Sequence, residues 1–207
     1  MANVGGIVLC GGKSSRMGRP KPWLPIAGVP MLCRVVQTLA QVVQPVVVVS
    51  ARELTLPPLP AEVIIAYDEQ PDRGPMQGLA AGLACIAERA DAAFVTSCDV
   101  PLLRAAFVKR MMELAEGYSL CLPDFADGAH PLAGVYRVSM LAEVQALLNR
   151  DQLRLLDLLD RVPTRRVREA ELLDIDPEFV SLRNINTPAE YSRLSEISDS
   201  TSCNVDG

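Results

Sequence analysis

The sequence predicts an α/β fold in which helices cover both faces of a mostly parallel β-sheet, giving a three-layer α/β/α sandwich. Two observations support this prediction. Short runs rich in β-branched residues alternate with longer segments whose apolar residues recur at helical spacing. The short runs are also apolar at nearly every position, which is typical of strands that helices bury on both faces.

Predicted strands and helices alternate along the first half of the chain. The strands are bounded by Gly, Pro or Asp and lie at residues 6–10, 46–50, 63–68 and 92–99. Between them, the spacing of apolar residues predicts helices at 31–43 and 78–89. The resulting order, β-α-β-β-α-β, fits a Rossmann-like sheet.

The second half continues the pattern with further helices and strands. We expect a helix at residues 103–115, strands at 118–122 and 132–138, and a polar turn between these strands that contains Asp124, Asp127 and Gly128.

Capping residues mark the remaining helices. Ser139 is the expected N-cap of a helix that runs through Leu148, and a short helix follows at residues 153–159. Thr187-Pro188 places a capping residue and a first-position proline before a last helix at 189–197.

Length and charge narrow the class of protein. The 207 residues suit one domain, which we place at residues 1–197, with a disordered tail at 198–207. The formal net charge of −5 disfavours binding to nucleic acid, because proteins of that kind concentrate basic charge. A small anionic ligand held by a few local cations remains compatible with this charge.

The sequence shows no membrane or export signal. Its apolar stretches are far shorter than the roughly 20 residues that span a bilayer, and its N-terminus lacks the parts of a secretory signal. We therefore expect a cytoplasmic protein. Six cysteines without a Cys-x-x-Cys motif and a single histidine disfavour a zinc site, so the cysteines fit small buried side chains.

The most informative segment is residues 9–21, LCGGKSSRMGRPK, which follows the first predicted strand. It holds three glycines, two hydroxyl side chains and four basic residues. Glycines let backbone N–H groups approach an anion closely, and Lys and Arg supply positive charge. The composition of this segment therefore indicates a phosphate-binding loop.

Two common phosphate-binding motifs do not fit this loop. A Walker A motif that ends at Gly12-Lys13-Ser14 would need a glycine where Ile7 stands. The dinucleotide motif G-x-G-x-x-G cannot be placed on Gly11, Gly12 and Gly18. A dehydrogenase of the Rossmann type is therefore a weak alternative.

The loop instead matches the pattern L-x-G-G-x-S-x-R-M-G-x-x-K. Its fixed positions are filled by Leu9, Gly11, Gly12, Ser14, Arg16, Met17, Gly18 and Lys21. The further motifs are Gly74-Pro75-Met76-Gln77-Gly78-Leu79, Cys98-Asp99-Val100-Pro101, His130-Pro131-Leu132 and Asn184-Ile185-Asn186-Thr187-Pro188. Through these motifs, over residues 5–195, the sequence resembles the molybdenum cofactor guanylyltransferase family of nucleotidylyltransferases.

This resemblance implies a fold of the nucleotide-diphospho-sugar transferase type and an enzyme that transfers GMP from Mg²⁺-bound GTP to a molybdopterin-type cofactor, releasing pyrophosphate. A molybdoenzyme or its chaperone is an expected further partner. The expected catalytic residues are Arg16, Lys21 and Asp99. Arg16 and Lys21 would bind the triphosphate and stabilise charge on the leaving pyrophosphate, whereas Lys13 and Arg19 fit the solvated face of the loop.

Asp99 is the candidate metal ligand. It ends a predicted apolar strand, and ligands of open α/β sheets bind beyond the carboxyl ends of the strands. Mg²⁺ usually takes one or two carboxylates and completes its shell with water and phosphate oxygens, so one Asp is enough. The alternative is a solvated Asp that caps the next turn.

The resemblance also implies which residues bind each substrate. Those for GTP are Leu9, Cys10, Gly11, Gly12, Ser14, Lys21, Asp68, Gly78 and Asp99. Those for the pterin and its phosphate are His130, Arg154, Asn184 and Asn186. The Asp68 carboxylate can accept from N1–H and the exocyclic amine of guanine, with Asp72 as a rival, and plain structural roles stay open for Asp68 and His130.

Two positions depart from the guanylyltransferase pattern. Ser50 stands where Asn is frequent, and Pro20, typical of cytidylyltransferases, stands where Asp is common. Cytidylyltransferases, however, usually carry A-A-G in place of Gly11-Gly12 and D-x-D-T-P at the last motif. Guanine is therefore the favoured base. The alternatives are a cytidylyl- or sugar-nucleotidyltransferase and a non-catalytic protein that binds a nucleotide or molybdopterin.

Overall fold

The computed structural model describes residues 3–11, 20–68, 70 and 73–193. Its strands are β1 (Val4–Cys10), β2 (Pro25–Ile26), β3 (Val29–Pro30), β4 (Val46–Ser50), β5 (Ile64–Tyr67), β6 (Ala92–Ser97), β7 (Leu120–Phe125), β8 (Gly128–Ala129), β9 (Ala133–Arg137) and β10 (Thr164–Val167). Its α-helices are α1 (Met31–Ala40), α2 (Gly74–Ile86), α3 (Ala105–Leu114) and α4 (Leu141–Asn149). Short 3₁₀ helices include η2 (Lys21–Trp23), η4 (Val138–Met140), η5 (Leu155–Leu158) and η7 (Val180–Leu182).

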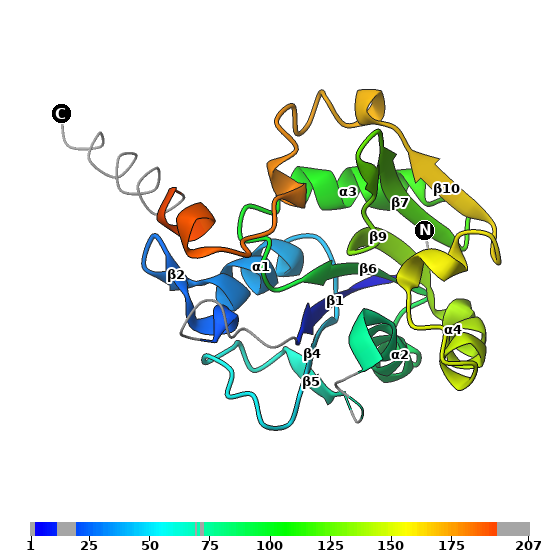
Figure 1. Ribbon diagram of the computed structural model, residues 1–207, viewed down its shortest axis with the longest axis horizontal. Helices are drawn as coiled ribbons and strands as arrows, with labels where there is room; N and C mark the ends of the chain where they lie inside the picture. The colour runs from blue at the N-terminus through cyan, green and yellow to red at the C-terminus, as the bar shows by residue number, and fades with distance from the viewer. Residues whose placement is uncertain (1–2, 12–19, 69, 71–72, 194–207) are drawn as a thin grey trace.

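One mixed sheet forms the centre of the fold (Figure 1). Its strand order is β10-β7-β9-β6-β1-β4-β5, with β8 paired to β7. Strands β6, β1, β4 and β5 run parallel to one another, and β9 is antiparallel to both β6 and β7. The predicted mostly parallel sheet is therefore confirmed.

Helices cover the sheet on both faces because the strands are apolar on both sides. On β1, the alternate residues Val8 and Cys10 pack in one core cluster with side chains of α1 and α3. Ile7 and Leu9 point the other way and pack with side chains of α2 and α4. Two hydrophobic layers thus hold the predicted α/β/α sandwich together, and this prediction is confirmed.

The sheet order places a topological switch point beside β1. From β1 the chain continues to β4 and then to β5 on one side, and it returns to β6 on the other side of β1. Ligands of doubly wound sheets bind at such a reversal, outside the carboxyl ends of the strands. The loop after β1 and the turn after β6 both lie at this edge.

Several element boundaries differ from the sequence predictions. Helix α2 begins at Gly74, four residues earlier than expected, because Gly74 adopts a φ of 70° and Pro75 fits the first helical turn. Strand β7 extends to Phe125, so Asp124 belongs to a β7–β8 hairpin and not to a turn. Ser139 lies inside η4 and does not cap α4, whose N-cap position is Met140.

The last predicted helix begins as expected in the part of the chain that the structure describes. Thr187 Oγ1 accepts from the backbone N–H of Glu190 at 3.2 Å, and Glu190 Oε2 accepts from the N–H of Thr187 at 2.9 Å. These reciprocal bonds form a capping box. The predicted tail at 198–207 lies outside the described residues.

No helix among residues 3–11, 20–68 and 73–193 is long and apolar enough to cross a membrane.

Helix α2 packs on the central strands through glycine. A Cβ atom at Gly82 would lie 2.7 Å from Ile7 Cγ2 and 3.2 Å from Val49 Cγ2, so a larger residue must push the helix away from the sheet. We expect Gly82→Val to lower the free energy of unfolding by about 1–3 kcal/mol in urea titrations. The matched change Ala84→Val, on the exposed side of α2, should alter it by about 0.5 kcal/mol or less. Equal stability of the two variants would contradict this account of the helix–sheet contact.

Candidate active site

A lysine and an aspartate meet at the switch point. Lys21 is the first residue of η2, and Asp99 lies in the turn directly after β6. Lys21 Nζ donates to Asp99 Oδ2 at 2.9 Å, and both side chains are largely buried, with 18% and 15% of their surface exposed. The hydroxyl of Ser97 donates to the other oxygen, Asp99 Oδ1. The carboxylate is thus fixed in one orientation, beside a cation, at the edge where a ligand can enter.

A third chain segment completes this cluster. Lys21 Nζ also donates to Asn186 Oδ1 at 2.7 Å, and the N–H of Ile185 donates to the carbonyl of Asp99 at 2.9 Å. The N–H of Asn186 donates to Glu190 Oε2 at 2.8 Å. The hydrogen bonds from the Asn186 and Thr187 N–H groups hold the pKa of Glu190 below its usual value, which keeps this cap ionised.

The strand ends beneath the cluster are closely joined. The N–H of Cys98 donates to the carbonyl of Leu9 at 3.1 Å. The thiol of Cys10 has a raised pKa because it hydrogen-bonds with the Cys98 thiol and because it is buried. The Cys10 thiol therefore stays protonated, and both cysteines are buried in the core, which fits the expected role of the cysteines. The side chains of Leu9 and Cys10 are buried, so these two residues can contact a ligand only through the backbone.

Part of the predicted phosphate loop lies outside the described residues. Gly12, Ser14 and Arg16 belong to that part. Gly11, the last described residue before it, is exposed, and a Cβ atom there would meet no atom of the described residues within 4 Å. The described part of the chain therefore leaves the carboxyl end of β1 uncovered.

Two of the residues predicted to bind the base, Asp68 and Gly78, have different surroundings. Asp68 directly follows β5, its N–H donates to the carbonyl of Ser50 at 2.9 Å, and its Oδ1 accepts from the N–H of Gln70 at 2.8 Å. Gly78, expected at the start of a helix, lies inside α2, where a Cβ atom would come within 3.3 Å of Leu9 Cδ2. Gly78 therefore allows α2 to pack against β1. Asp72, the rival of Asp68, lies outside the described residues.

Two of the predicted acceptor residues share a cavity of about 250 Å³. His130 and Asn184 line it together with Ser181 and Val100. Within the described chain, His130 Nε2 makes no hydrogen bond and lies 3.6 Å from Asp127 Oδ1. The cavity thus offers an imidazole, an amide and a hydroxyl in an otherwise apolar wall.

The other two predicted acceptor residues are placed elsewhere. Asn186 contacts Lys21 and not this cavity, so it links the last predicted motif to the Lys21–Asp99 pair. Arg154 is exposed just before η5 and does not line the cavity.

Sequence reasoning missed three polar residues near these sites: Ser97, Asp127 and Ser181. Ser97 and Ser181 are almost fully buried, with 9% and 1% of their surface exposed. A buried hydroxyl two residues before a strand-end Asp is a usable signal for Ser97. In the sequence, nothing distinguishes Asp127 from other polar turn residues. In the structure, the β7–β8 hairpin places it beside His130.

The donor set suits a metal that relies on phosphate and water. Asp99 supplies one carboxylate at the switch point, and the described residues contain no group of three or more His, Cys, Asp or Glu side chains that could hold a metal. A cage made of protein ligands is thus not present among them. Mg²⁺ needs no such cage, because it usually keeps several waters and binds one or two carboxylates plus substrate phosphates.

The sheet order and the cluster at its switch point are those of a doubly wound α/β protein with a candidate active site beyond the carboxyl ends of its strands. Residues 6–165 match the family described as MobA-like NTP transferase domain, so the chain belongs to this family and is a nucleotidyltransferase. The molybdenum cofactor guanylyltransferase of Desulfosudis oleivorans is 30% identical to it, over 93% of this chain and 95% of the relative.

Solved structures share the fold. The molybdopterin-guanine dinucleotide biosynthesis protein A of Archaeoglobus fulgidus superposes with a TM-score of 0.78 at 22% identity and covers 95% of this chain and 98% of that one. The 2-C-methyl-D-erythritol 4-phosphate cytidylyltransferase of Thermus thermophilus reaches 0.65 at 16% identity, covering 94% and 98%. These similarities show the fold of the chain. The identity of the nucleotide has to be inferred from the residues of the site.

The Lys21–Asp99 pair should matter for activity far more than for stability. We expect Asp99→Asn to remain folded, because the amide oxygen still accepts hydrogen bonds, and to lower nucleotidyl transfer by at least about 100-fold. Thermal unfolding and a pyrophosphate-release assay measure the two effects. Asp174→Asn is the matched control, since Asp174 pairs with Arg110 at 2.7 Å on an exposed surface. Near-normal turnover of Asp99→Asn would remove Asp99 from the catalytic machinery.

Proposed function

We propose that this protein is a molybdenum cofactor guanylyltransferase, which transfers GMP from GTP to the terminal phosphate of molybdopterin and releases pyrophosphate. The observation that carries the proposal is the junction of Lys21, Asp99 and Asn186 at the switch point of the sheet. The name of the relative from Desulfosudis oleivorans supports the choice of substrates. We place the reaction in the cytoplasm, with a molybdoenzyme or its chaperone as the recipient of the product.

The proposed reaction joins two phosphates. An oxygen of the acceptor phosphate attacks the α-phosphorus of GTP, and a new P–O bond forms. The bond from the α-phosphorus to the bridging oxygen breaks, and its electron pair leaves with pyrophosphate. No covalent enzyme intermediate is needed, so the protein must hold two mutually repelling anions in line and stabilise the charge that develops.

Lys21 is suited to that task. Its ammonium group has three donors, of which one is directed to Asp99 Oδ2 and one to Asn186 Oδ1. Within the described part of the chain, the third donor is left for a phosphate oxygen. Because Asp99 and Asn186 come from different segments, they fix the position of the cation before any substrate arrives. Arg16, from the loop outside the described residues, is the proposed second cation.

Mg²⁺ is the proposed metal, and Asp99 would hold it through a carboxylate oxygen together with water and phosphate oxygens. When bound, it would neutralise charge on the triphosphate. Asp99 can serve as its ligand without losing its orientation, because Ser97 anchors the other carboxylate oxygen.

The remaining predicted residues divide between the two substrates. We assign Asp68, Gly11 and the backbone of Leu9 and Cys10 to the guanosine part of GTP, with Gly12 and Ser14 on its phosphates. We assign the His130–Asn184 cavity to the pterin, and Asn186 and Arg154 to its phosphate. Gly78 acts in this proposal by bringing α2 close to Leu9.

A substrate panel tests the nucleotide and the acceptor together. The purified protein is incubated with molybdopterin and either GTP, CTP, ATP or UTP in the presence of Mg²⁺, and pyrophosphate release is measured. We expect GTP to be preferred by at least about 100-fold, because the hydrogen-bonding groups of the site would remain unpaired with the other bases. A preference for CTP would replace the proposal by a cytidylyltransferase. Nucleotide binding without pyrophosphate release for any acceptor would favour a non-catalytic protein.

Removal of the metal gives a separate prediction. Treatment with EDTA should abolish pyrophosphate release, and added Mg²⁺ should restore it, whereas the thermal unfolding curve should change little because the described fold contains no metal cage. Full activity in EDTA would contradict the proposed role of Mg²⁺.

A further inference from the structure

The acceptor of the proposed function is large for the cavity assigned to it. A molybdopterin-type cofactor carries a phosphate at one end and a 2-amino-4-oxo-pyrimidine ring at the other. The His130–Asn184 cavity has a volume of about 250 Å³, whereas ligand sites commonly measure about 300–1,000 Å³. We therefore looked for a further space that adjoins this cavity and suits the ring.

The His130–Asn184 cavity itself starts beside the proposed phosphate site. Val100, which lines it, directly follows Asp99 in the sequence. Asn184, which also lines it, directly precedes Ile185, and the N–H of Ile185 donates to the carbonyl of Asp99 at 2.9 Å. An acceptor whose phosphate lies at Asp99 thus has this cavity next to it for the rest of the molecule.

A second cavity, which we call the Phe125–Phe179 cavity after two of its lining residues, adjoins the first. Its volume is about 380 Å³, and His130 and Leu182 line both cavities. A ligand that begins at the phosphate site can therefore continue past His130 into the second cavity. Together the two cavities reach the size that is common for ligand sites.

Part of the wall of the Phe125–Phe179 cavity is aromatic. The ring centroids of Phe125 and Phe179 are 4.9 Å apart, and the ring of His130 meets Phe125 at 5.3 Å with an interplanar angle of 64°. Both phenylalanines are only half-buried. Because aromatic rings pack favourably against one another, this wall suits a flat heterocycle.

Three carboxylates line the same cavity, and one of them is unpaired within the described part of the chain. Asp127 Oδ1 lies 3.6 Å from His130 Nε2, and Glu178 Oε2 lies 3.7 Å from Arg183 Nη2. The side chain of Glu169 makes no hydrogen bond or ion pair with any described residue, and Glu169 is exposed. Both of its carboxylate oxygens can therefore accept from a ligand.

A carboxylate matches one edge of the pyrimidine ring of the acceptor. That edge presents two donors side by side, the N3–H group and the 2-amino group. A carboxylate has two oxygens and can accept both hydrogen bonds at once. Hydrogen bonds to an ionised acceptor are also stronger than those between neutral groups.

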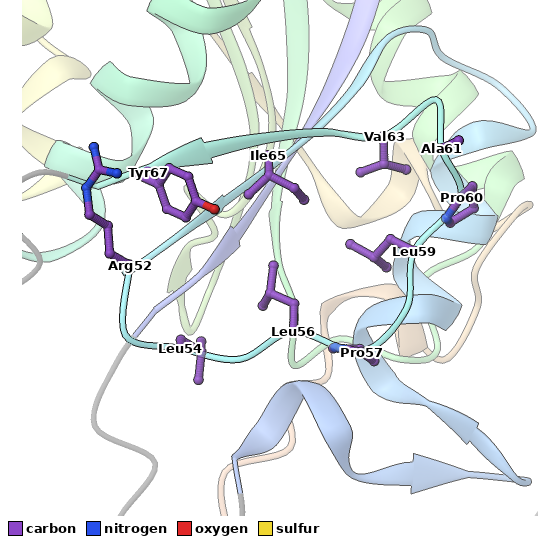
Figure 2. A pocket seen from close by; sticks show the side chains of 10 residues that line it. All are labelled: Arg52, Leu54, Leu56, Pro57, Leu59, Pro60, Ala61, Val63, Ile65 and Tyr67. Atoms are coloured by element: carbon purple, nitrogen blue, oxygen red, sulfur yellow. The ribbon is translucent and has the colours of Figure 1, made fainter.

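The cavity beside β5 does not combine these features. It has a volume of about 350 Å³, and Figure 2 shows its walls, with aliphatic side chains such as Leu54, Leu56 and Ile65. Apart from Arg52 and Tyr67, the described residues that line it are aliphatic or proline, and none of them is acidic. It therefore provides no carboxylate for the two donors of the ring.

We propose that the pyrimidine ring of the acceptor binds in the Phe125–Phe179 cavity, where Glu169 accepts hydrogen bonds from its N3–H and 2-amino groups. This inference rests on the proposed function, because it takes a molybdopterin-type cofactor as the acceptor. Glu169 is then a residue that determines acceptor specificity, and it lies apart from the phosphates that react.

Steady-state kinetics of Glu169→Met test the proposal. Methionine is of similar length but cannot replace the carboxylate as a strong acceptor. We expect the KM for molybdopterin to rise about ten-fold, while kcat and the KM for GTP change by about two-fold or less, because only binding of the ring is weakened. Glu116→Met is the matched control. Glu116 is exposed just beyond the end of α3 and lines neither cavity, so all three constants should stay at their wild-type values.

Ring analogues give a readout that a purely structural role of Glu169 would not change. Pterin presents both donors, whereas lumazine has a carbonyl oxygen in place of the 2-amino group. As inhibitors competing with molybdopterin, pterin should be about ten-fold stronger than lumazine for the wild-type protein, and the two should be equal for Glu169→Met. Phe125→Leu should weaken both inhibitors alike, because it removes aromatic surface and no acceptor.

The outcomes distinguish this inference from the proposed function. If Glu169→Met keeps the wild-type KM for molybdopterin, or if the wild-type protein does not prefer pterin to lumazine, the inference is wrong although the proposed function stands. If Glu178→Met removes the preference for pterin and Glu169→Met does not, the assignment to Glu169 is wrong. If the wild-type protein transfers no nucleotide to molybdopterin, the proposed function fails and the inference fails with it.

Discussion

The parallel pairing of β1 with both β4 and β6 is the constraint on which the site depends. It sets three carboxyl strand ends side by side at the edge of the sheet. The hydrogen bond from the Cys98 N–H to the carbonyl of Leu9 extends the pairing of β6 with β1 by one residue, as far as the residue before Asp99. The bond from Ile185 to Asp99 then holds the last motif against the sheet. Lys21 can therefore meet partners that lie far away in the sequence.

The central elements of this fold are predictable because their burial leaves a pattern. Strands β1, β4 and β6 are buried at nearly every position, so they appear in the sequence as continuous apolar runs. The edge strand β10, Thr-Arg-Arg-Val, leaves no such run, because its arginines pair with Glu171 and Asp124 outside the core. The two-residue strands β2 and β3 are too short to show any period. Helix α2 is misplaced because a Gly-Pro pair predicts a turn equally well.

The chemistry of the site is predictable in part, for a different reason. A strand-end Asp and the lysine of a glycine-rich loop can be recognised in the sequence from their residue type and position. The structure places Lys21 and Asp99 within hydrogen-bonding distance of each other. The contact between Lys21 and Asn186 has no such signal, because 165 residues separate them and only the sheet order decides that they meet. Sequence reasoning missed Ser97 and Asp127 because each contacts another site residue, Asp99 and His130 respectively, and the sequence does not show these contacts.

In the proposed function, the base and the phosphates are assigned to parts of the fold with different freedom to change. Lys21 and Asp99 meet beyond the carboxyl ends of the central strands, whose side chains enter both core layers. Asp68 follows β5, the edge strand, beside a segment that borders solvent. In the proposed function, changes there alter hydrogen bonding to the base without moving the phosphate site. One scaffold can therefore keep the transfer chemistry while different edge residues select different nucleotides.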